Sequence, residues 1–378
     1  MPTVIKQPTL SDKLSILSRD SQYDLACACG TNDYEHRTRS KDDKWIYPVT
    51  TLAGRTTYLF KILLSNECVN DCKYCPLRAG MDPRRCRLKP EELVKVFFDY
   101  YRERKVSGLF LSSGVIGTPD RTMDMLIGAA SMLRRRNFRG YIHLKILPGA
   151  SDEAICQALA LANAVSLNIE TAGEKHFREL SKAKDYIEDI IRPIKLISSL
   201  TQKGSRYSHV KQTTQFVVGA AGESDREIVS YSWGLYRRLN FHRVYFSAYQ
   251  RGLGDSGLSG EKSTSSNAEM LTREHRLYQA DWLMRKYGFK SEEIPFDSTG
   301  NLSLANDPKE AWALNNMDKF PVNVNKADKF ELLRVPGLGE VTVKRILELR
   351  ANKHHISHME DIGRVNKLLQ KASAYVSF

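Results

Sequence analysis

The sequence has no long hydrophobic run and few cysteines. None of its apolar stretches approaches the roughly 20 residues needed to cross a bilayer, and its N-terminus lacks the apolar core of a signal peptide. Seven cysteines among 378 residues are too few for a disulfide scaffold. These absences predict a cytoplasmic protein without a membrane partner, in which thiols are available for metal or redox chemistry.

The charge is unbalanced toward basic residues. The chain has 57 Lys and Arg against 44 Asp and Glu, a formal net charge of +13. Its composition of 42% hydrophobic and 27% charged residues excludes a disordered or collagen-like chain. At about 150 residues per domain, the length predicts two or three domains. The basic charge is compatible with a polyanionic partner.

Three cysteines lie within eight residues, at Cys68, Cys72 and Cys75. Soft thiolates at this spacing favour an iron–sulfur cluster or zinc. A structural zinc site needs four ligands, commonly as two separated pairs, and the next cysteine, Cys86, follows eleven residues later. We therefore predict that the three thiolates bind a [4Fe–4S] cluster and leave one iron open for a small molecule. Three buried thiols or a partial zinc site is the alternative.

Strand-like and helix-like segments alternate around this motif. An apolar run at 58–64 precedes the cysteines, so the cysteine loop leaves the carboxyl end of a strand. Further strands are predicted at 108–111, 141–147, 164–169, 213–218 and 243–248, and helices at 90–104, 123–135, 152–162, 185–200 and 227–239. The six repeats predict an α/β fold, a partial (βα)6 TIM-like barrel with its function at the carboxyl ends of the strands.

The chain resembles the radical S-adenosylmethionine (SAM) superfamily in its cysteine motif. It resembles one subfamily over nearly the whole chain, in segments such as FKILLSNECVNDCKYCPLR, GLFLSSGVIGTPD, YIHLKILPGAS and TTQFVVGAAGESDREI. Members of that subfamily are described as DNA modification or repair proteins with a C-terminal helix-hairpin-helix. The resemblance implies a [4Fe–4S] cluster and SAM as cofactors, reductive cleavage of SAM to a radical that takes hydrogen from the substrate, and an electron donor such as flavodoxin or ferredoxin.

The resemblance also implies roles for individual residues. Cys68, Cys72 and Cys75 are the implied cluster ligands, and Tyr74 is expected beside the adenine of SAM. The second strand usually ends in a Gly-Gly-Glu-like turn, but this chain has serines and a glycine there, so hydroxyls or carbonyls replace the missing glutamate. The other cofactor-binding candidates, each of which is otherwise a helix cap, a loop glycine or a surface residue, are Ser112, Ser113, Gly114, Lys145, Asn168, Glu170, Gly219 and Ser247.

Two further segments concern the substrate cavity. Cys27 matches a recurrent cysteine of the subfamily, and we expect it either to approach the substrate as a catalytic hydrogen or electron relay or to be a buried structural thiol. Residues 255–267 are rich in Gly and Ser and are predicted to form a mobile loop that gates substrate entry. Residues 84–87, with three arginines, are predicted either to meet phosphates near the cysteine loop or to form a solvated face.

After Pro308 the sequence predicts two short helices, at 327–334 and 340–350, joined by a tight glycine turn; Asn325 is the expected N-cap of the first. This pattern resembles a helix-hairpin-helix, which grips the DNA backbone without reading its sequence, and residues 357–375 resemble a second, degenerate hairpin. A small helical packing domain is the alternative. The resemblance assigns the DNA contacts to Gly337, Leu338, Gly339, Lys344 and Arg345.

These observations divide the chain into an N-terminal extension (1–50), a radical SAM partial barrel (51–305) and a small all-α helix-hairpin-helix domain (306–378). The leading hypothesis is an enzyme that cleaves SAM reductively at its cluster to modify or repair a base or sugar of DNA. A radical SAM enzyme acting on RNA, tRNA or a nucleotide is one alternative. A DNA-binding protein with a structural or redox-sensing cluster is the other.

Overall fold

The computed structural model describes residues 8–21, 46–50, 54 and 56–378. Cys27 and Cys29 lie outside the described residues, so the hypothesis for Cys27 stays untested. The chain divides into two compact units, Met1–Glu223 with Gly234–Met270, and Ser224–Trp233 with Leu271–Phe378. The three segments drawn from the sequence remain a prediction. No helix in the described part of the chain is both long and apolar enough to cross a bilayer.

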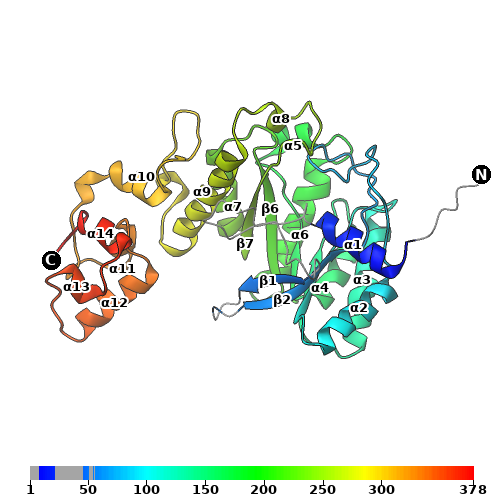
Figure 1. The fold of residues 1–378 in the computed structure, drawn as a ribbon, viewed down its shortest axis with the longest axis horizontal. Helices are drawn as coiled ribbons and strands as arrows, with labels where there is room; N and C mark the ends of the chain where they lie inside the picture. Colours follow the sequence, from blue (N-terminus) through cyan, green and yellow to red (C-terminus); the bar gives the residue numbers. More distant parts are fainter. Residues whose placement is uncertain (1–7, 22–45, 51–53, 55) are drawn as a thin grey trace, which may run out of the picture. The chain divides into compact units, whose positions relative to one another are not determined.

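The first unit is built on a seven-stranded sheet whose strands follow one another in chain order (Figure 1). Its six parallel strands are those expected from the sequence, and the sheet curls into an open half-barrel with β1 and β7 at its edges. The predicted α/β partial barrel is therefore confirmed. The parallel strands are β2 (Thr56–Leu63), β3 (Gly108–Ser112), β4 (Tyr141–Lys145), β5 (Ala164–Ser166), β6 (Lys211–Val218) and β7 (Arg243–Ala248).

The sequence reading missed the seventh strand, β1 (Ile46–Thr50), and placed its residues in an extension. β1 pairs antiparallel with β2, from Ile46 opposite Phe60 to Thr50 opposite Thr56. It contains Pro48, which cannot donate a ladder hydrogen bond and is tolerated because β1 is an edge strand. The helix α1 (Leu10–Asp20) was also missed; Thr9 caps it and accepts a hydrogen bond from the Asp12 N–H at 3.2 Å.

Helices follow the strands, as expected for βαβ units. Polar N-caps and proline in the first turn start several of them: Thr118 caps α3 and Ser151 caps α4, while Pro90 begins α2. The core lies between these helices and the sheet, where the rings of Phe97 and Phe138 meet edge to face at 4.8 Å. Besides α1, the helices that lie wholly in the described part of this unit are α2 (Pro90–Arg102), α3 (Pro119–Arg135), α4 (Asp152–Leu161), α5 (Glu174–Leu180), α6 (Arg192–Thr201) after a π-helical turn (Tyr186–Ile191), and α8 (Ser259–Lys262).

Two helices, α7 (Asp225–Leu239) and α9 (Asn267–Lys286), contain the points where the chain passes between units. The rest of the second unit is small and mostly helical, but the prediction of an all-α domain was wrong, because this unit also contains a two-stranded sheet. It comprises α10 (Pro308–Leu314), α11 (Lys329–Arg334), α12 (Glu340–Ala351), α13 (Met359–Ile362) and α14 (Lys367–Ser373), two 3-10 turns (Ser291–Glu293 and Met317–Lys319) and the short parallel strands β8 (Val322–Asn323) and β9 (Val376–Ser377).

The predicted N-cap Asn325 was wrong. The helix α11 begins at Lys329, and Asp328 caps it by accepting hydrogen bonds from the N–H groups of Phe330 (2.7 Å) and Glu331 (2.8 Å). The Asn325 amide instead pairs with the backbone N–H and C=O of Ile356 at 3.0 and 2.8 Å. The side chain joins two distant segments, a tertiary contact that local sequence does not reveal.

Candidate active site

The cysteine loop leaves the carboxyl end of β2, as expected, and is joined to the end of β3. The Gly114 N–H donates to the Ser65 carbonyl at 2.8 Å, and the Val69 N–H donates to the Val115 carbonyl at 3.0 Å. A Cβ on Gly114 would stand 2.2 Å from the carbonyl oxygen of Glu67. Only glycine therefore allows the turn after β3 to approach the cysteine loop this closely.

The thiols of Cys68, Cys72 and Cys75 line one cavity with the ends of β3 to β6. Backbone amides face two of the sulfurs: Val115 N–H donates to Cys68 Sγ and Leu77 N–H to Cys75 Sγ, both at 3.4 Å. Among the described residues, no three His, Cys, Asp or Glu side chains are grouped closely enough to hold a single metal ion. Three thiols that face one cavity but do not converge on one point fit a cubane, whose ligands bind separate irons, better than zinc.

Burial makes the thiolate forms costly in the protein alone. It raises the pKa of Cys75 to about 12, and the neighbouring Cys72 adds to this effect. Burial also raises the pKa of Cys72, although the charge of Lys184 partly opposes it. Because a metal ligand must be a thiolate, these sulfurs need a cationic partner such as iron to ionise at neutral pH.

Lys184 is a site residue that the sequence reading missed. It is 9% exposed, lines the cavity and is hydrogen-bonded to the Cys72 thiol. Burial lowers the pKa of the Lys184 ammonium, but the charges of Cys72 and Glu170 outweigh that effect and raise it. Lys184 therefore brings a positive charge to the cavity. Lys184 lies in a loop after α5 and not at the end of a strand, so the local sequence did not mark it as a site residue.

Asp71 ties the Lys184 loop to the cysteine loop. Its carboxylate accepts hydrogen bonds from the Ser181 hydroxyl and from the N–H groups of Lys182 (2.8 Å) and Ala183 (3.2 Å). The Lys73 N–H also donates to the Leu180 carbonyl at 2.8 Å. The two loops are thus held together on both sides of Cys72.

The cavity brings together most of the cofactor-binding candidates. Gly219 and Ser247 are not in its lining. Two lining atoms, Ser113 Oγ and Asn168 Oδ1, are buried and have no hydrogen-bond partner among the described residues. Orphaned oxygens of this kind are expected where a polar ligand completes the site. The candidates that line it are Tyr74, Ser112, Ser113, Gly114, Lys145, Asn168 and Glu170.

Tyr74 and Glu170 interact inside the cavity. Burial raises the pKa of Tyr74 well above its usual value, and the charge of Glu170, which is hydrogen-bonded to it, raises it further. Glu170 has a positive φ of 65° and is fixed by its backbone: its carbonyl accepts from the Val217 N–H at 2.7 Å, and its N–H donates to the Gln215 carbonyl at 3.1 Å. Tyr74 is therefore a neutral phenol with a fixed carboxylate partner.

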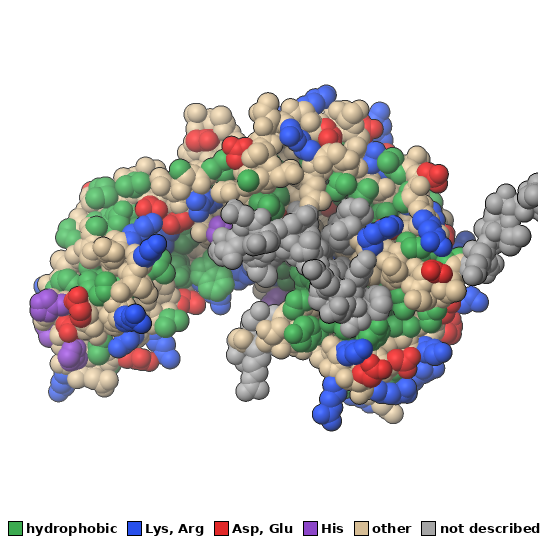
Figure 2. Space-filling view, in the orientation of Figure 1, with side chains coloured by type: hydrophobic (Ala, Val, Ile, Leu, Met, Phe, Trp, Pro, Cys, Tyr) green, Lys and Arg blue, Asp and Glu red, His purple; other side chains and the backbone are tan. Residues whose placement is uncertain are grey.

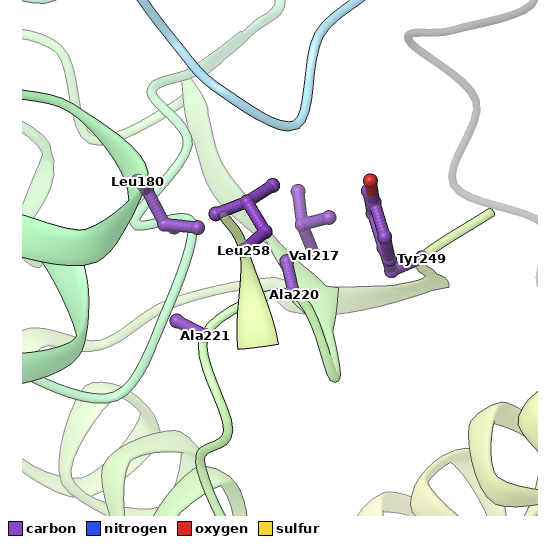
Figure 3. Close-up of a cluster of buried hydrophobic side chains, with 6 residues drawn as sticks. All are labelled: Leu180, Val217, Ala220, Ala221, Tyr249 and Leu258. Atoms are coloured by element: carbon purple, nitrogen blue, oxygen red, sulfur yellow. The ribbon is translucent and has the colours of Figure 1, made fainter. Parts of the chain in front are cut away.

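An apolar cluster forms the wall behind Tyr74. Figure 3 shows that its side chains come from the end of α5, the end of β6 and the segment after β7. Gly219 lies in the turn that follows β6, and its N–H donates to the Glu223 carboxylate at 2.6 Å. Gly219 thus helps to fix the backbone of the wall. The cluster consists of Leu180, Val217, Ala220, Ala221, Tyr249 and Leu258.

The loop predicted to be a mobile gate is anchored over its first part. The Asp255 N–H donates to the Lys73 carbonyl at 2.8 Å, and Gly260 N–H donates to the Ala220 carbonyl at 3.0 Å. Glu261 gathers the same segment by accepting from the Tyr249 hydroxyl and from the N–H groups of Gly252 (2.9 Å) and Gly254 (3.2 Å). Residues 252–261 are a strap against the cysteine loop.

Arg85 does not present its charge to a partner outside the chain. Its guanidinium donates to the carbonyl oxygens of Leu77 (2.9 Å), Arg78 (3.0 Å) and Met81 (3.1 Å), and also to that of Asn66. Neither expectation for the arginine run, a phosphate contact or a solvated face, describes this residue. Arg85 folds the segment after the third cysteine back onto the start of the loop.

In the second unit the predicted glycine turn is present between α11 and α12. Gly337 has a φ of +88°, and a Cβ there would stand 2.1 Å from the carbonyl oxygen of Leu368 on α14. Gly339 is the N-cap of α12 and supplies no side-chain cap, and a Cβ there would find only the Tyr287 hydroxyl, at 3.6 Å. Gly337 packs the two hairpins together, whereas a Cβ on Gly339 would make one ordinary contact and no clash.

The charged candidates of this turn are accessible. Lys344 and Arg345 are exposed on α12, and Lys344 pairs with Glu348 at 3.5 Å. In Figure 2 the Lys and Arg side chains are interspersed with Asp and Glu on the viewed face and do not gather in one basic patch. The net charge of +13 therefore does not by itself mark a nucleic-acid surface on that face.

Comparison with known families agrees with both parts of the geometry. Residues 62–231 match the model of the Radical SAM superfamily. The chain is an enzyme with a radical SAM domain. Residues 318–375 match the model of the helix-hairpin-helix motif. Enzymes of the radical SAM superfamily use a [4Fe–4S] cluster and SAM. The three thiols of this cavity suit the cluster, and its two buried oxygens without a partner suit SAM. No curated protein matches the radical SAM chain in sequence.

Two solved structures are similar to this chain in fold. The FeFe-hydrogenase maturase HydG from Carboxydothermus hydrogenoformans is 17% identical, with a TM-score of 0.47 over 60% of this chain and 51% of HydG. Methylornithine synthase (PylB) is 16% identical, with a TM-score of 0.45 over 72% of this chain and 75% of its own. The chain thus spans about half the length of that HydG.

Proposed function

We propose that this radical SAM enzyme binds its cluster through Cys68, Cys72 and Cys75 and uses it to modify or repair DNA at a base or sugar. The observation that carries the proposal is the convergence of three thiols and two orphaned polar oxygens on one cavity, in a chain that also contains a helix-hairpin-helix motif. When bound, the cluster and SAM supply a radical that takes a hydrogen atom from the substrate.

The cavity offers complementary groups for each part of SAM. The Ser113 hydroxyl and the neighbouring Ser112 and Gly114 suit the methionyl amine. The ammonium of Lys184, with Lys145 as the second lysine of the lining, suits the methionyl carboxylate. Both lysines are less than one-tenth exposed, so their charges act in a low-dielectric site.

The nucleoside part of SAM is expected against the apolar wall. Tyr74 packs on that wall and offers a ring face to the adenine. Asn168 and Glu170 present the amide and carboxylate that suit ribose hydroxyls. Gly219 shapes the wall, and Ser247 belongs to β7 without lining the cavity. The wall also excludes water, which protects a reactive intermediate.

The second unit supports a nucleic-acid substrate. The N-cap Gly339 supplies no side-chain acceptor to α12, and the first amide, Glu340 N–H, is hydrogen-bonded to the Tyr287 hydroxyl. The amides that follow it can receive a phosphate. The second hairpin differs, because Asn366 caps α14 by accepting from Leu368 N–H (3.0 Å) and Leu369 N–H (3.1 Å). We therefore assign the DNA backbone contact to Gly337, Leu338 and Gly339, with Lys344 and Arg345 adding charge.

The first experiment tests the enzyme chemistry. The full chain is reconstituted anaerobically with iron and sulfide, reduced, and assayed for 5′-deoxyadenosine. Changing Cys68, Cys72 or Cys75 to Ser is expected to abolish both bound iron and SAM cleavage. Cys156→Ser, on α4 and outside the cavity lining, is the matched control. A cluster that persists without SAM cleavage would instead favour the structural or redox-sensing alternative.

The second experiment tests the nucleic acid. Binding of duplex DNA, duplex RNA and tRNA to the full chain is measured against salt concentration. Lys344→Gln with Arg345→Gln is expected to lower the slope of log affinity against log salt by about one per lost phosphate contact, and Gly339→Ala to weaken binding without unfolding the hairpin. Gly234→Ala, with no atom within 4 Å of its added Cβ, is the control. Preference for RNA or tRNA would overturn the DNA assignment.

The product and the cellular setting belong to the same proposal. Nucleosides from host DNA with and without the gene, compared by mass spectrometry, are expected to differ in one modified species. An electron donor such as flavodoxin or ferredoxin in the cytoplasm would supply the reducing electron. An unchanged nucleoside profile in DNA, together with a change in tRNA, would contradict the DNA substrate.

A further inference from the structure

The interior of the half-barrel carries polar and aromatic side chains one layer below the cysteine cavity. Successive side chains on a strand point to opposite faces. Phe60 packs toward α2, with its ring 6.4 Å from that of Phe97, so Lys61 faces the interior. The register places Lys61 beside Phe110 and Phe110 beside His143, on β2, β3 and β4.

The opposite side of the half-barrel continues this layer. Gln215 on β6 is paired with Tyr245 on β7, and Gln215 also belongs to the lining of the cysteine cavity. On β6 the Gln212 amide donates to the Ile194 carbonyl of α6 at 2.9 Å, so Thr213 points inward. The Thr213 hydroxyl is buried and has no partner among the described residues. The two sides together present an ammonium, an imidazole, an amide and the two aromatic rings of Phe110 and Tyr245.

Contacts within the layer fix its geometry. The Lys61 ammonium lies 4.8 Å from the ring centre of Phe110 and 5.2 Å from that of Tyr47 on β1. The rings of Phe110 and His143 are 4.3 Å apart with an interplanar angle of 41°. The His143 Nε2 is 2.9 Å from the Ser166 hydroxyl. A cation is therefore held over the face of Phe110, and the His143 ring packs against the same side chain.

This composition is unlike that of a barrel whose interior is only a core. The layers inside a closed (βα)8 barrel are dominated by bulky branched aliphatic residues. Here Lys61, His143 and Gln215 are 6%, 6% and 7% exposed, while the ring of Phe110 is only half-buried. A half-buried ring in the interior indicates space for a ligand beside these polar side chains.

We propose that this layer, defined by Lys61, Phe110, His143, Gln215 and Tyr245, receives one nucleotide unit of the substrate; the proposal rests on the proposed function. The rings of Phe110 and Tyr245 are only half-buried. The aromatic surface that Lys61, His143 and Arg243 leave uncovered can contact a planar base. The Gln215 amide has both donors and an acceptor for a base edge. Lys61 supplies the cation for the phosphate.

The position relative to the thiols supports this role. Lys61, Phe110 and His143 each precede a cavity-lining residue by two positions on the same strand, and Gln215 itself lines the cavity. Two residues of a strand span about 6.6 Å. A nucleotide held in this layer therefore lies next to the cavity proposed for SAM. A base in a duplex reaches it only after leaving the stack, at a cost of a few kcal/mol.

The test measures binding without catalysis. Equilibrium dialysis of the anaerobically reconstituted full chain uses the four deoxynucleoside 5′-monophosphates, their ribonucleotide counterparts and the phosphate-free nucleosides. Lys61→Met is expected to weaken binding of monophosphates about tenfold and to leave nucleosides unaffected. Phe110→Leu is expected to weaken both about tenfold, and Gln215→Glu to change the order of preference among bases. The ribonucleotide arm separates DNA from RNA.

Controls separate this inference from loss of structure. Lys95→Met, on the exposed face of α2, removes a lysine elsewhere; Lys61→Arg keeps the charge and should keep monophosphate affinity. Unsaturable binding, or Lys61→Met and Phe110→Leu chains that bind like wild type, would overturn the proposal. A chain that cleaves SAM but binds no probe refutes this inference alone. A chain that binds the probes but does not cleave SAM refutes the proposed function alone.

Discussion

The Asp71 carboxylate accepts a hydrogen bond from the Lys182 backbone N–H at 2.8 Å, and this contact joins the cysteine loop to the loop that carries Lys184. Asp71 lies one residue before Cys72, while Lys182 is 111 positions later in the chain. The interaction thus couples the predicted cluster-binding segment to Lys184, a buried lysine that is hydrogen-bonded to the Cys72 thiol.

Removing the Asp71 carboxylate should displace Lys184. Asp71→Ala loses three hydrogen bonds to an ionised acceptor at a partly exposed position, where each contributes about 0.5–1.5 kcal/mol. We expect SAM to bind at least tenfold more weakly to the reconstituted chain, as measured by equilibrium dialysis. Asp71→Asn can still accept hydrogen bonds and should lose less affinity for SAM. Asp99→Ala, on the exposed face of α2, should bind SAM as tightly as wild type. Equal affinity in Asp71→Ala and wild type would contradict the tether.

Two glycines in the first unit form a matched pair for substitution. Gly114→Ala places a Cβ 2.2 Å from the Glu67 carbonyl oxygen, whereas a Cβ on Gly128 of α3 meets no atom within 4 Å. Gly114→Ala should cost about 1–3 kcal/mol or more and reduce iron loading. Gly128→Ala should stabilise α3 by about 0.5–1 kcal/mol. Thermal unfolding and iron content check both, and a full iron load in Gly114→Ala would refute the close-approach argument.

Glu261 should control the strap over the cysteine loop. Burial alone raises the pKa of Glu261, but hydrogen bonds from Tyr249, Gly252 and Gly254 outweigh it and lower the pKa. The carboxylate therefore stabilises the strap above the usual pKa of glutamate, and this contribution is lost as pH falls through the lower, folded value. Glu261→Ala should speed tryptic cleavage after Arg251 about tenfold. Glu103→Ala, exposed at the end of α2, is the control; unchanged cleavage would contradict the anchoring.

Lys309 should give the second unit an unusual pH dependence. Its ammonium donates to the Leu338 carbonyl of the glycine turn, and burial lowers the pKa of Lys309 to about 7, with Asp307 opposing weakly. An unfolded lysine titrates near about 10.4, so between these values only the unfolded chain holds the proton and stability rises with pH. Thermal unfolding from pH 6.5 to about 10 should show this rise in wild type and in the Lys286→Met control. Lys309→Met should flatten the rise of stability with pH. A rise equally steep in Lys309→Met and wild type would contradict its attribution to Lys309.

Local sequence determined the strands, the cysteine loop and the hairpin. The spacing of Cys68, Cys72 and Cys75 is a property of one short segment, so it needs no tertiary information. Alternation of apolar strands and helices likewise gave six parallel strands, because that pattern depends on periodicity alone. The edge strand that contains Pro48 was not predicted, because it is not part of a strand–helix repeat and proline is unusual within strands.

Only the tertiary structure decided which distant side chains meet the thiols. Lys184 and Asp71 acquire their roles through hydrogen bonds to residues more than one hundred positions away. Arg85 was expected to meet phosphate or solvent, but its guanidinium binds backbone carbonyls instead. The interior placement of Lys61 beside Phe110 depends on how two strands pair in register. Short-range spacing fixes which residues a turn or strand contains, but the closure of the half-barrel fixes which charges and rings share one space.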